Sequence, residues 1–233
     1  MLSIKVINET KILELDFNDD IFIEVLDNGN LTLKLLNSTS LNGFKISANI
    51  GKNSNLQVFF ADFSLNDFEL NSLINLNEIG ASADWHLATL ANQKFNKKFD
   101  VSFIHNVGNT IASMNNYGVA KDCSKIVFSG VNHIKRGSKN SKTYQNAKII
   151  VFDQKANGVA SPILRIDEND VIASHGAVVG RLNDDHMFYL MSRGLSEKDA
   201  RELITRGYLE PIKRHFNEEN QAKIDSLLKE NIQ

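Results

Sequence analysis

A chain of 233 residues is long enough to bury a core, and its 42% of hydrophobic and 23% of charged residues are typical of an ordinary globular protein. The formal net charge of −2 supplies no basic field, which argues against nucleic acid or an anionic membrane as a partner. The sequence begins without a signal-peptide-like apolar run and nowhere contains the roughly 18 consecutive apolar residues that a transmembrane helix requires. Because Cys123 is the only cysteine, no internal disulfide or cysteine-rich metal site forms, and we expect a cytoplasmic location.

Residues 1–182 read as short β-strands separated by turns. Leu31, Leu33 and Leu35 alternate with polar residues, which is the period of a half-buried strand. The preceding Asp, Asn, Gly and Asn at 27–30 form a strong turn signal, because Asn and Gly tolerate positive φ. Further strand-like runs have their centres roughly 22 to 23 residues apart, within the range of solenoid repeats. These centres lie near Phe59, Ser82, Phe103, Val127, Ile150 and Ile172.

No long amphipathic helix fits between these runs, which disfavours βαβ crossovers. Two architectures remain: an antiparallel β-sandwich, and a parallel β-helix that adds one turn of chain per repeat. The turns of a sandwich usually come about every 8 to 12 residues. The longer repeat therefore favours a mainly β fold, a parallel β-helix, for residues 1–182.

Beyond residue 183 the spacing of apolar residues becomes helical. Ser196, followed three positions later by Asp199, resembles a capping box with an acid in place of the usual Glu. Asn217 is expected to cap a last helix. We therefore predict a β-helix core at 1–182 and a C-terminal helical region at 183–233. Helices packed over the open end of a solenoid would cover its unpaired strand edges, and we expect them there.

Three motifs follow one another between about Lys139 and Tyr208. Residues 142–151 read KTYQNAKIIV, residues 166–177 read IDENDVIASHGA, and residues 187–195 read MFYLMSRGL. Together they resemble the C-terminal signature of the SufB/SufD family, in which a K-T-Y-Q strand precedes an acidic turn, S-H-G-A and F-Y-L-x-S-R-G. The resemblance is specific within this span, because separate motifs occur in order at similar distances.

Two positions favour the SufD type within that family. Ser174 and Gly176 flank His175, where SufB-type chains have carboxylates. Leu190 follows Tyr189, where those chains have a cysteine. Full-length members carry a longer N-terminal region with helices, whereas strand-like residues begin here almost at once.

The resemblance implies a right-handed parallel β-helix with a small C-terminal α-helical region. It also implies a scaffold subunit of an iron–sulfur cluster assembly complex that catalyses no reaction alone. A SufC-like ABC ATPase would dock on the C-terminal helices, and the β-helix would pair with a SufB-like paralogue or an identical subunit. A transient iron–sulfur cluster would lie near that subunit interface, and no tightly bound cofactor is expected.

His175 is the candidate ligand for iron or a cluster. An imidazole nitrogen ligates iron in Rieske centres, and the neighbouring Gly176 leaves room for a cluster or a partner backbone. The family's proposed histidine ligand falls on this residue. The alternative is a turn histidine that hydrogen-bonds to the backbone at the end of the solenoid. Ala173 occupies a position where SufD sequences often have cysteine, which weakens a thiolate-ligand hypothesis there.

Three further residues carry potential ligand atoms without a partner nearby in the sequence. Cys123 is a weak candidate for a metal ligand or sulfur acceptor, because a thiolate serves both roles. The alternative is a single structural cysteine. His86 and His105 lie in strand-like runs, and we expect hydrogen-bonded structural histidines that face the solenoid interior.

The candidate partner-binding residues lie in the helical region. Ser192, Arg193 and Gly194 precede the capped helix and would shape an ATPase-docking surface. An apolar face follows them, of which most would cover the solenoid and a smaller part would remain for helix-in-groove docking. Its residues are Ala200, Leu203, Ile204 and Tyr208.

Two other function classes fit a β-helix. One is an interaction module without cluster chemistry, for which the low cysteine count argues. The other is a carbohydrate-active enzyme, which needs paired acids about 5 to 10 Å apart. The acids here cluster in turns, which suits solvated corners better. They are Asp19 and Asp20, Glu168 and Asp170, and Asp184 and Asp185.

Overall fold

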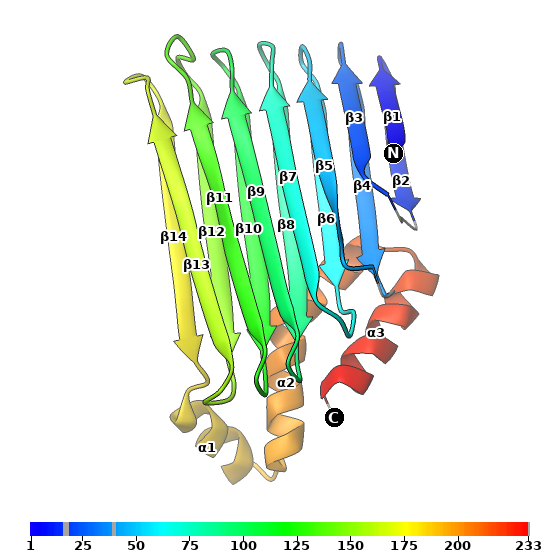
Figure 1. Cartoon of the computed structure of the whole chain (residues 1–233), viewed down its shortest axis with the longest axis vertical. Coiled ribbons are helices and arrows are strands. Elements are labelled where there is room, and N and C mark those ends of the chain that lie inside the picture. The colour runs from blue at the N-terminus through cyan, green and yellow to red at the C-terminus, as the bar shows by residue number, and fades with distance from the viewer. Residues whose placement is uncertain (16–18, 39–40, 233) are drawn as a thin grey trace.

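The computed structural model describes residues 1–15, 19–38 and 41–232. Within them, the strands form two parallel sheets that face each other as a solenoid (Figure 1), which confirms the predicted parallel β-helix. Sheet A contains β1 (Leu2–Ile7), β3 (Ile21–Leu26), β5 (Gly43–Ile50), β7 (Phe68–Leu76), β9 (Asn96–His105), β11 (Lys125–Ile134) and β13 (Asn157–Ile166). Sheet B contains β2 (Thr10–Leu15), β4 (Asn30–Asn37), β6 (Asn55–Asp62), β8 (Ser82–Ala91), β10 (Ile111–Ala120), β12 (Lys142–Val151) and β14 (Ile172–Arg181).

One turn of the solenoid adds a strand to each sheet and is longer than the sequence predicts. Hydrogen-bonded side chains on adjacent turns of sheet B are 27 residues apart for Ser82 and Asn55 and 29 for Ser113 and Asp84. The predicted repeat of 22 to 23 residues is therefore wrong. Its centres mix strands of the two sheets, since Ser82 lies on β8 and Phe103 on β9.

The main core lies between the two sheets. Alternate residues of most strands point inward and are buried, as the pattern of β9 illustrates. Aromatic rings from successive turns stack along the interior at centroid distances of 5.7 to 6.1 Å, within the range of favourable aromatic pairs. They belong to Phe44, Phe60, Phe68, Phe99 and Phe128. This stacking helps to fix the register of one turn on the next.

The helical region consists of α1 (Asp184–Ser192), α2 (Glu197–Leu209), the 3₁₀ helix η1 (Glu210–His215) and α3 (Glu218–Ile232). Both predicted caps are confirmed. The Ser196 hydroxyl accepts a hydrogen bond from the Asp199 amide at 3.1 Å. The Asn217 side chain accepts one from the Asn220 amide at 2.8 Å.

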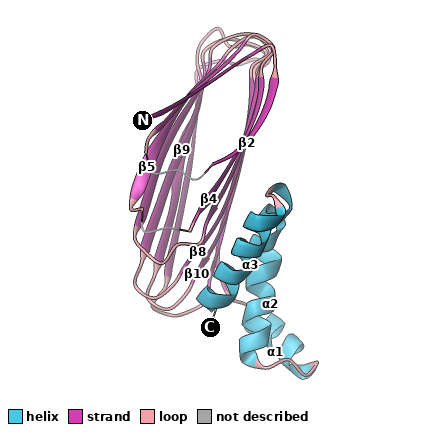
Figure 2. Ribbon diagram, turned by 90° about the vertical axis from the view of Figure 1, so that its right-hand side faces the viewer, coloured by secondary structure: helices cyan, strands magenta, loops and turns pink. Residues whose placement is uncertain are grey.

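The helices pack on the outer face of sheet B and leave the end of the solenoid open (Figure 2), so the prediction that they cover that end is wrong. A second core forms there, because apolar side chains on the outer face of sheet B pack against apolar side chains of the helices. Its buried residues are Leu36, Phe59, Ala61, Phe63, Ala88, Leu90, Val119, Phe152, Leu209, Ile212, Phe216, Ile224 and Leu228. The change from strand to helix falls between Arg181 and Asp184, and the division into domains at 182–183 stays a prediction.

Candidate functional site

The last turn of the solenoid, β13 and β14, has two free edges. Among the described strands, β13 pairs with β11 alone and β14 with β12 alone. Each outer edge therefore carries backbone N–H and C=O groups that no further strand pairs, which makes it a template for another strand. Figure 1 shows this pair at the end of the solenoid opposite β1 and β2.

Apolar side chains are exposed on these two strands, and we call them, with the free strand edges, the edge surface. Between 37% and 55% of each residue is accessible, and a cluster of exposed apolar side chains often marks a protein interface. They are Ile163, Ile166, Ile172, Val178 and Val179. The sequence analysis missed this surface. Adjacent valines at 178–179, one on each face of a strand, are the signal that indicates it.

His175 lies in the middle of β14 and not in a turn. It is in register with Gln145 of β12, whose side chain is buried inside the solenoid. Paired residues of parallel strands point to the same face. The imidazole therefore faces the solenoid interior, and it is exposed because β14 has no further strand on its outer edge.

The interior behind His175 is polar, unlike the apolar core of the earlier turns. Asn132 donates a hydrogen bond to the Thr143 hydroxyl at 2.8 Å, and the Gln145 amide donates one to the Gly130 carbonyl at 3.5 Å. Buried side-chain oxygens of Asn116, Asn132 and Gln145 have no hydrogen-bond partner among the described residues. A cavity of about 10 Å³ beside Gln145 and Asn116 has room for about one water molecule. This end of the solenoid is thus suited to hydrated or polar contents.

The acidic turn between β13 and β14 accepts hydrogen bonds from the previous turn of the solenoid and from its own backbone. The Glu168 carboxylate accepts hydrogen bonds from the Gly137 and Asn169 amides, each at 2.9 Å, and these bonds lower the pKa of Glu168. The His133 imidazole lies 2.6 Å from the Asp167 carboxylate, and this hydrogen bond lowers the pKa of Asp167. Both acids hold the last turn in place.

The other candidate ligands lie elsewhere. Cys123 is exposed in the turn between β10 and β11, where its amide donates to the Gln93 carbonyl at 2.8 Å. His105 faces the interior as predicted, with Nδ1 2.7 Å from the Thr110 hydroxyl, and burial lowers its pKa to about 4. The prediction of an interior position is wrong for His86, which lies on the outer face of sheet B and stacks on Phe59. Among the described residues, no group of three His, Cys, Asp or Glu is placed to hold a metal ion.

The predicted partner-binding residues divide between two sides of the helical region. Ser192, Arg193, Gly194 and Leu203 are exposed. Ala200 is buried, and Ile204 and Tyr208 are half-buried against the second core.

Further exposed apolar side chains lie on α1 just before Ser192, and we call the combined set the helical surface. It comprises Phe188, Tyr189, Met191, Ser192, Arg193, Gly194 and Leu203, and Phe188 alone is 75% exposed. The Arg193 guanidinium lies 5.3 Å from the centre of the Tyr189 ring, a cation–π contact that orients this corner. The partner-binding role stays a prediction.

Comparison with known proteins identifies the family. A family model described as the SufBD core domain of SUF system FeS cluster assembly matches residues 18–208. The chain belongs to the SufB/SufD family. The iron–sulfur cluster assembly protein SufD of Bacillus subtilis is 33% identical over 138 residues, which are 59% of this chain and 32% of that protein. A SufBD family protein of Staphylococcus saprophyticus is 28% identical over 54% of this chain and 27% of its own length.

As a SufB/SufD family member, the chain is more similar to SufD, in agreement with its Ser174-His175-Gly176 sequence. Family membership supports a role in iron–sulfur cluster assembly. The matched part spans about a third of the length of these curated relatives. Within the described residues, no helix combines the length and apolar character needed to cross a bilayer.

Proposed function

We propose that this chain is a non-catalytic scaffold subunit of a cytoplasmic SUF-type complex that assembles iron–sulfur clusters. The observation that carries the proposal is the open last turn of the solenoid, where His175 faces the interior beside two unpaired strand edges. Such an end offers a surface for a second subunit and a potential ligand in the same place. The SufB/SufD family match supports this role.

The edge surface pairs with a SufB-like subunit or with a second copy of this chain. An incoming strand adds to β13 or β14 through main-chain hydrogen bonds, as in β-augmentation. The exposed side chains of Ile163, Ile172 and Val178 then become buried, which supplies the hydrophobic part of the association.

His175 contributes one ligand to a cluster that is cargo of the complex. Iron–sulfur clusters are usually held by about four ligands, with histidine replacing cysteine in some centres. The partner subunit supplies the remaining ligands, since His175 lies at the proposed subunit interface. The polar interior around Gln145 and Asn132 accommodates charged iron and sulfide better than the apolar core does.

The helical surface binds a SufC-like ABC ATPase. Its exposed side chains of Phe188, Tyr189 and Leu203 provide an apolar patch, and Arg193 supplies a charge beside it. Nucleotide-dependent movement of the ATPase shifts the scaffold only if the ATPase binds two scaffold arrangements with different affinity.

The ligand role is tested in a complex reconstituted anaerobically from this chain, a SufB-like subunit and a SufC-like ATPase. His175→Ala should leave the complex assembled and lower its bound iron and sulfide. His186→Ala is the matched control, because His186 is an exposed histidine on α1. Unchanged iron and sulfide in His175→Ala would reject the ligand role and favour an interaction module without cluster chemistry.

The pairing surface is tested independently of cluster chemistry. Val178→Asp places a charge at the edge surface and should prevent association with the partner subunit in size-exclusion chromatography with light scattering. Leu65→Asp, which changes a 48% exposed residue between β6 and β7, should leave association unchanged. If Val178→Asp still associates with the partner subunit, the interface does not include this part of β14.

A further inference from the structure

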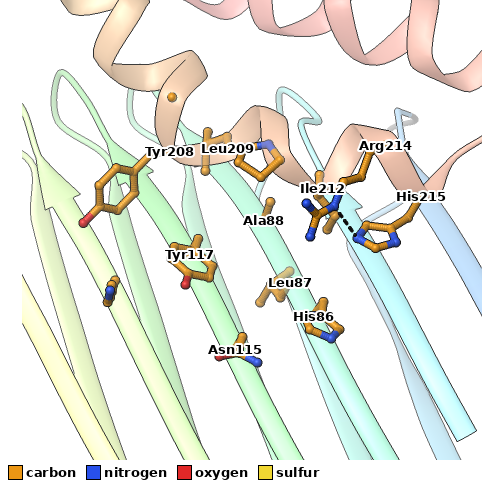
Figure 3. A pocket seen from close by; sticks show the side chains of 13 residues that line it. His86, Leu87, Ala88, Asn115, Tyr117, Tyr208, Leu209, Ile212, Arg214 and His215 are labelled. Carbon is orange, nitrogen blue, oxygen red and sulfur yellow. Dashed lines mark hydrogen bonds between the residues drawn. The ribbon is translucent and has the colours of Figure 1, made fainter.

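A cleft lies between the outer face of sheet B and the junction of α2 and η1 (Figure 3), and its lining residue Lys148 is in register with Val178 of the edge surface. Its volume is about 460 Å³, which is within the range of small-molecule sites. The floor comes from β8, β10 and β12, on which Ala88, Tyr117 and Lys148 are in register on successive turns. The roof includes Gly207, where an added Cβ would meet no atom within 4 Å. Small residues on both sides leave the space open.

The lining of this cleft carries positive charge without a compensating acid. Lys148 and Arg214 line it, and none of the lining residues is an aspartate or a glutamate. Within the described part of the chain, neither cation forms an ion pair. The Lys148 ammonium lies 5.8 Å from the centre of the Tyr117 ring, and Arg214 Nε donates to His215 Nε2 at 3.2 Å. Both cations thus keep donors for a ligand.

Charges just outside the cleft do not cancel this field. Burial lowers the pKa of His215 most, and the neighbouring Arg214 lowers it further, whereas Lys34 is paired with Glu14 at 3.7 Å. Asp84 is the one nearby acid that acts on His86, and its carboxylate already accepts the Ser113 hydroxyl at 2.5 Å. The balance around the cleft therefore favours an anion.

The walls of the cleft are aromatic. The lining rings of His215 and His86 stack on Phe59, which does not itself line the cleft, at 3.8 and 5.0 Å with interplanar angles of 14° and 12°. Tyr117 and Tyr208 meet edge to face at 6.0 Å across the boundary between sheet and helix. Rigid, flat side chains beside two cations suit a ligand that joins a planar ring to an anionic group.

We propose that this cleft binds a mononucleotide-sized anion in which a phosphate group is attached to a planar ring. Arg214 holds the phosphate through charge-assisted hydrogen bonds, for which a guanidinium group is well suited, and Lys148 adds a second positive charge at the Tyr117 end of the cleft. Tyr117, Tyr208 and the imidazole of His86 contact the ring. The site does not depend on the proposed scaffold function, because the cleft lies on the outer face of sheet B whereas His175 faces the solenoid interior.

The test measures binding of adenosine 5′-monophosphate and uridine 5′-monophosphate to the full chain by calorimetry, with adenosine and inorganic phosphate as separate probes. Both nucleotides should bind, and adenosine and phosphate should bind more weakly, since each makes only part of the contacts. No saturation by either nucleotide at millimolar concentration would overturn the proposal. Phosphate that binds as tightly as the nucleotides would also overturn it, because the ring would then make no contribution.

Variants locate the site. Arg214→Ala should weaken nucleotide binding about tenfold or more, as expected for loss of a hydrogen bond to a charged group, and Lys148→Ala should weaken it less. The matched controls are Arg136→Ala and Lys135→Ala, which remove exposed cations from the turn after β11. Gly207→Leu fills the cleft without removing a charge, favours the helix, and should abolish binding. Unchanged affinity in Gly207→Leu, or equal losses in the controls, would place binding elsewhere.

Discussion

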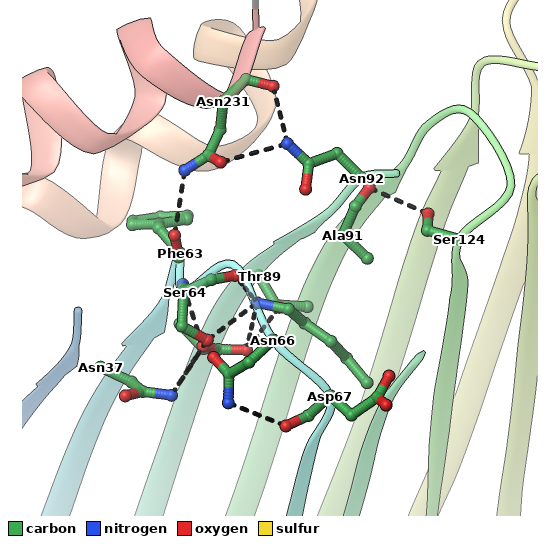
Figure 4. Close-up of polar contacts among 12 residues, drawn as sticks. Asn37, Phe63, Ser64, Asn66, Asp67, Thr89, Ala91, Asn92, Ser124 and Asn231 are labelled. Atoms are coloured by element: carbon green, nitrogen blue, oxygen red, sulfur yellow. Dashed lines mark hydrogen bonds and ion pairs between the residues drawn. The ribbon is translucent and has the colours of Figure 1, made fainter. Parts of the chain in front are cut away.

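Lys97 and Asp62 form an ion pair that is completely buried at the corner of the solenoid. The Lys97 ammonium lies 2.9 Å from the Asp62 carboxylate, and both side chains have no accessible surface. The ammonium also donates to the Ser64 carbonyl at 2.8 Å, and the Thr89 hydroxyl donates to Asp62 at 3.1 Å. Ser64 and Thr89 are labelled in Figure 4. Because the surrounding groups satisfy both ions, removal of one ion leaves the other buried without its counter-charge.

Lys97→Met should therefore lower the free energy of unfolding by about 3 to 5 kcal/mol, the usual cost of breaking a buried pair. Lys97→Met combined with Asp62→Asn should recover part of that loss, because no charge remains buried and the amide oxygen still accepts from Thr89. The control is Lys98→Met. Lys98 lies 2.8 Å from Glu69 with half of each side chain exposed, so its loss should cost about 0 to 1 kcal/mol.

Urea unfolding followed by the fluorescence of Trp85, the only tryptophan and fully buried, measures these differences. The reasoning about desolvation fails if Lys97→Met costs no more than Lys98→Met. It also fails if the double variant is less stable than Lys97→Met alone.

Three more perturbations follow from buried groups. Burial lowers the pKa of His105 from 6.5 to about 4. As the pH falls, His105 is therefore protonated in the unfolded chain before it is protonated in the folded one. Its neutral form therefore contributes full stability above pH 6.5. The free energy of unfolding should fall by about 2 kcal/mol between pH 7 and 5 because of His105. In a pH series of urea unfolding, His105→Asn should lack this decrease. A Cβ at Gly130, where φ is +156°, would overlap the Val101 carbonyl. Gly130→Ala should lower the free energy of unfolding, measured by thermal unfolding, by at least about 2 kcal/mol. Gly180→Ala, where a Cβ meets open space, should change it by no more than about 0.5 kcal/mol. Leu228→Ala should lower the free energy of unfolding by about 2 to 5 kcal/mol. Faster hydrogen exchange in α3 would show that the helix loosens from sheet B, and unchanged exchange would contradict the anchoring role of Leu228.

The sequence predicted the fold where local patterns are strong. The alternation of Leu31, Leu33 and Leu35 marks β4, and the caps at Ser196 and Asn217 mark the starts of α2 and α3. The length of one turn was not predictable in the same way. Strand β10 was missed because it carries polar residues on both faces, including the buried Asn116, so its period is weak.

The candidate site was only partly accessible from sequence. The family resemblance identified His175 as a candidate ligand. Its interior-facing position depends on its register with Gln145, which no local sequence pattern encodes. The cleft had no local signal at all. His86, Lys148 and Arg214 are far apart in the sequence, and only the stacking of turns and the docking of η1 bring them to one cavity. The helices were predicted as amphipathic, but the identity of the surface beneath them is a tertiary property.

The position of the helical region determines how the proposed complex would transmit movement. Because α2, η1 and α3 pack on the outer face of sheet B and α1 contacts α2, the proposed ATPase on the helical surface would act on the solenoid through α2. Leu209 and Ile224 are buried in the second core, and Arg201 of α2 lies 2.7 Å from Asp153 in the turn after β12. Close-packed interiors transmit displacement instead of absorbing it. In the proposed complex, a shift of α2 by the ATPase would therefore be passed to the solenoid and alter the contact between two solenoids beside His175.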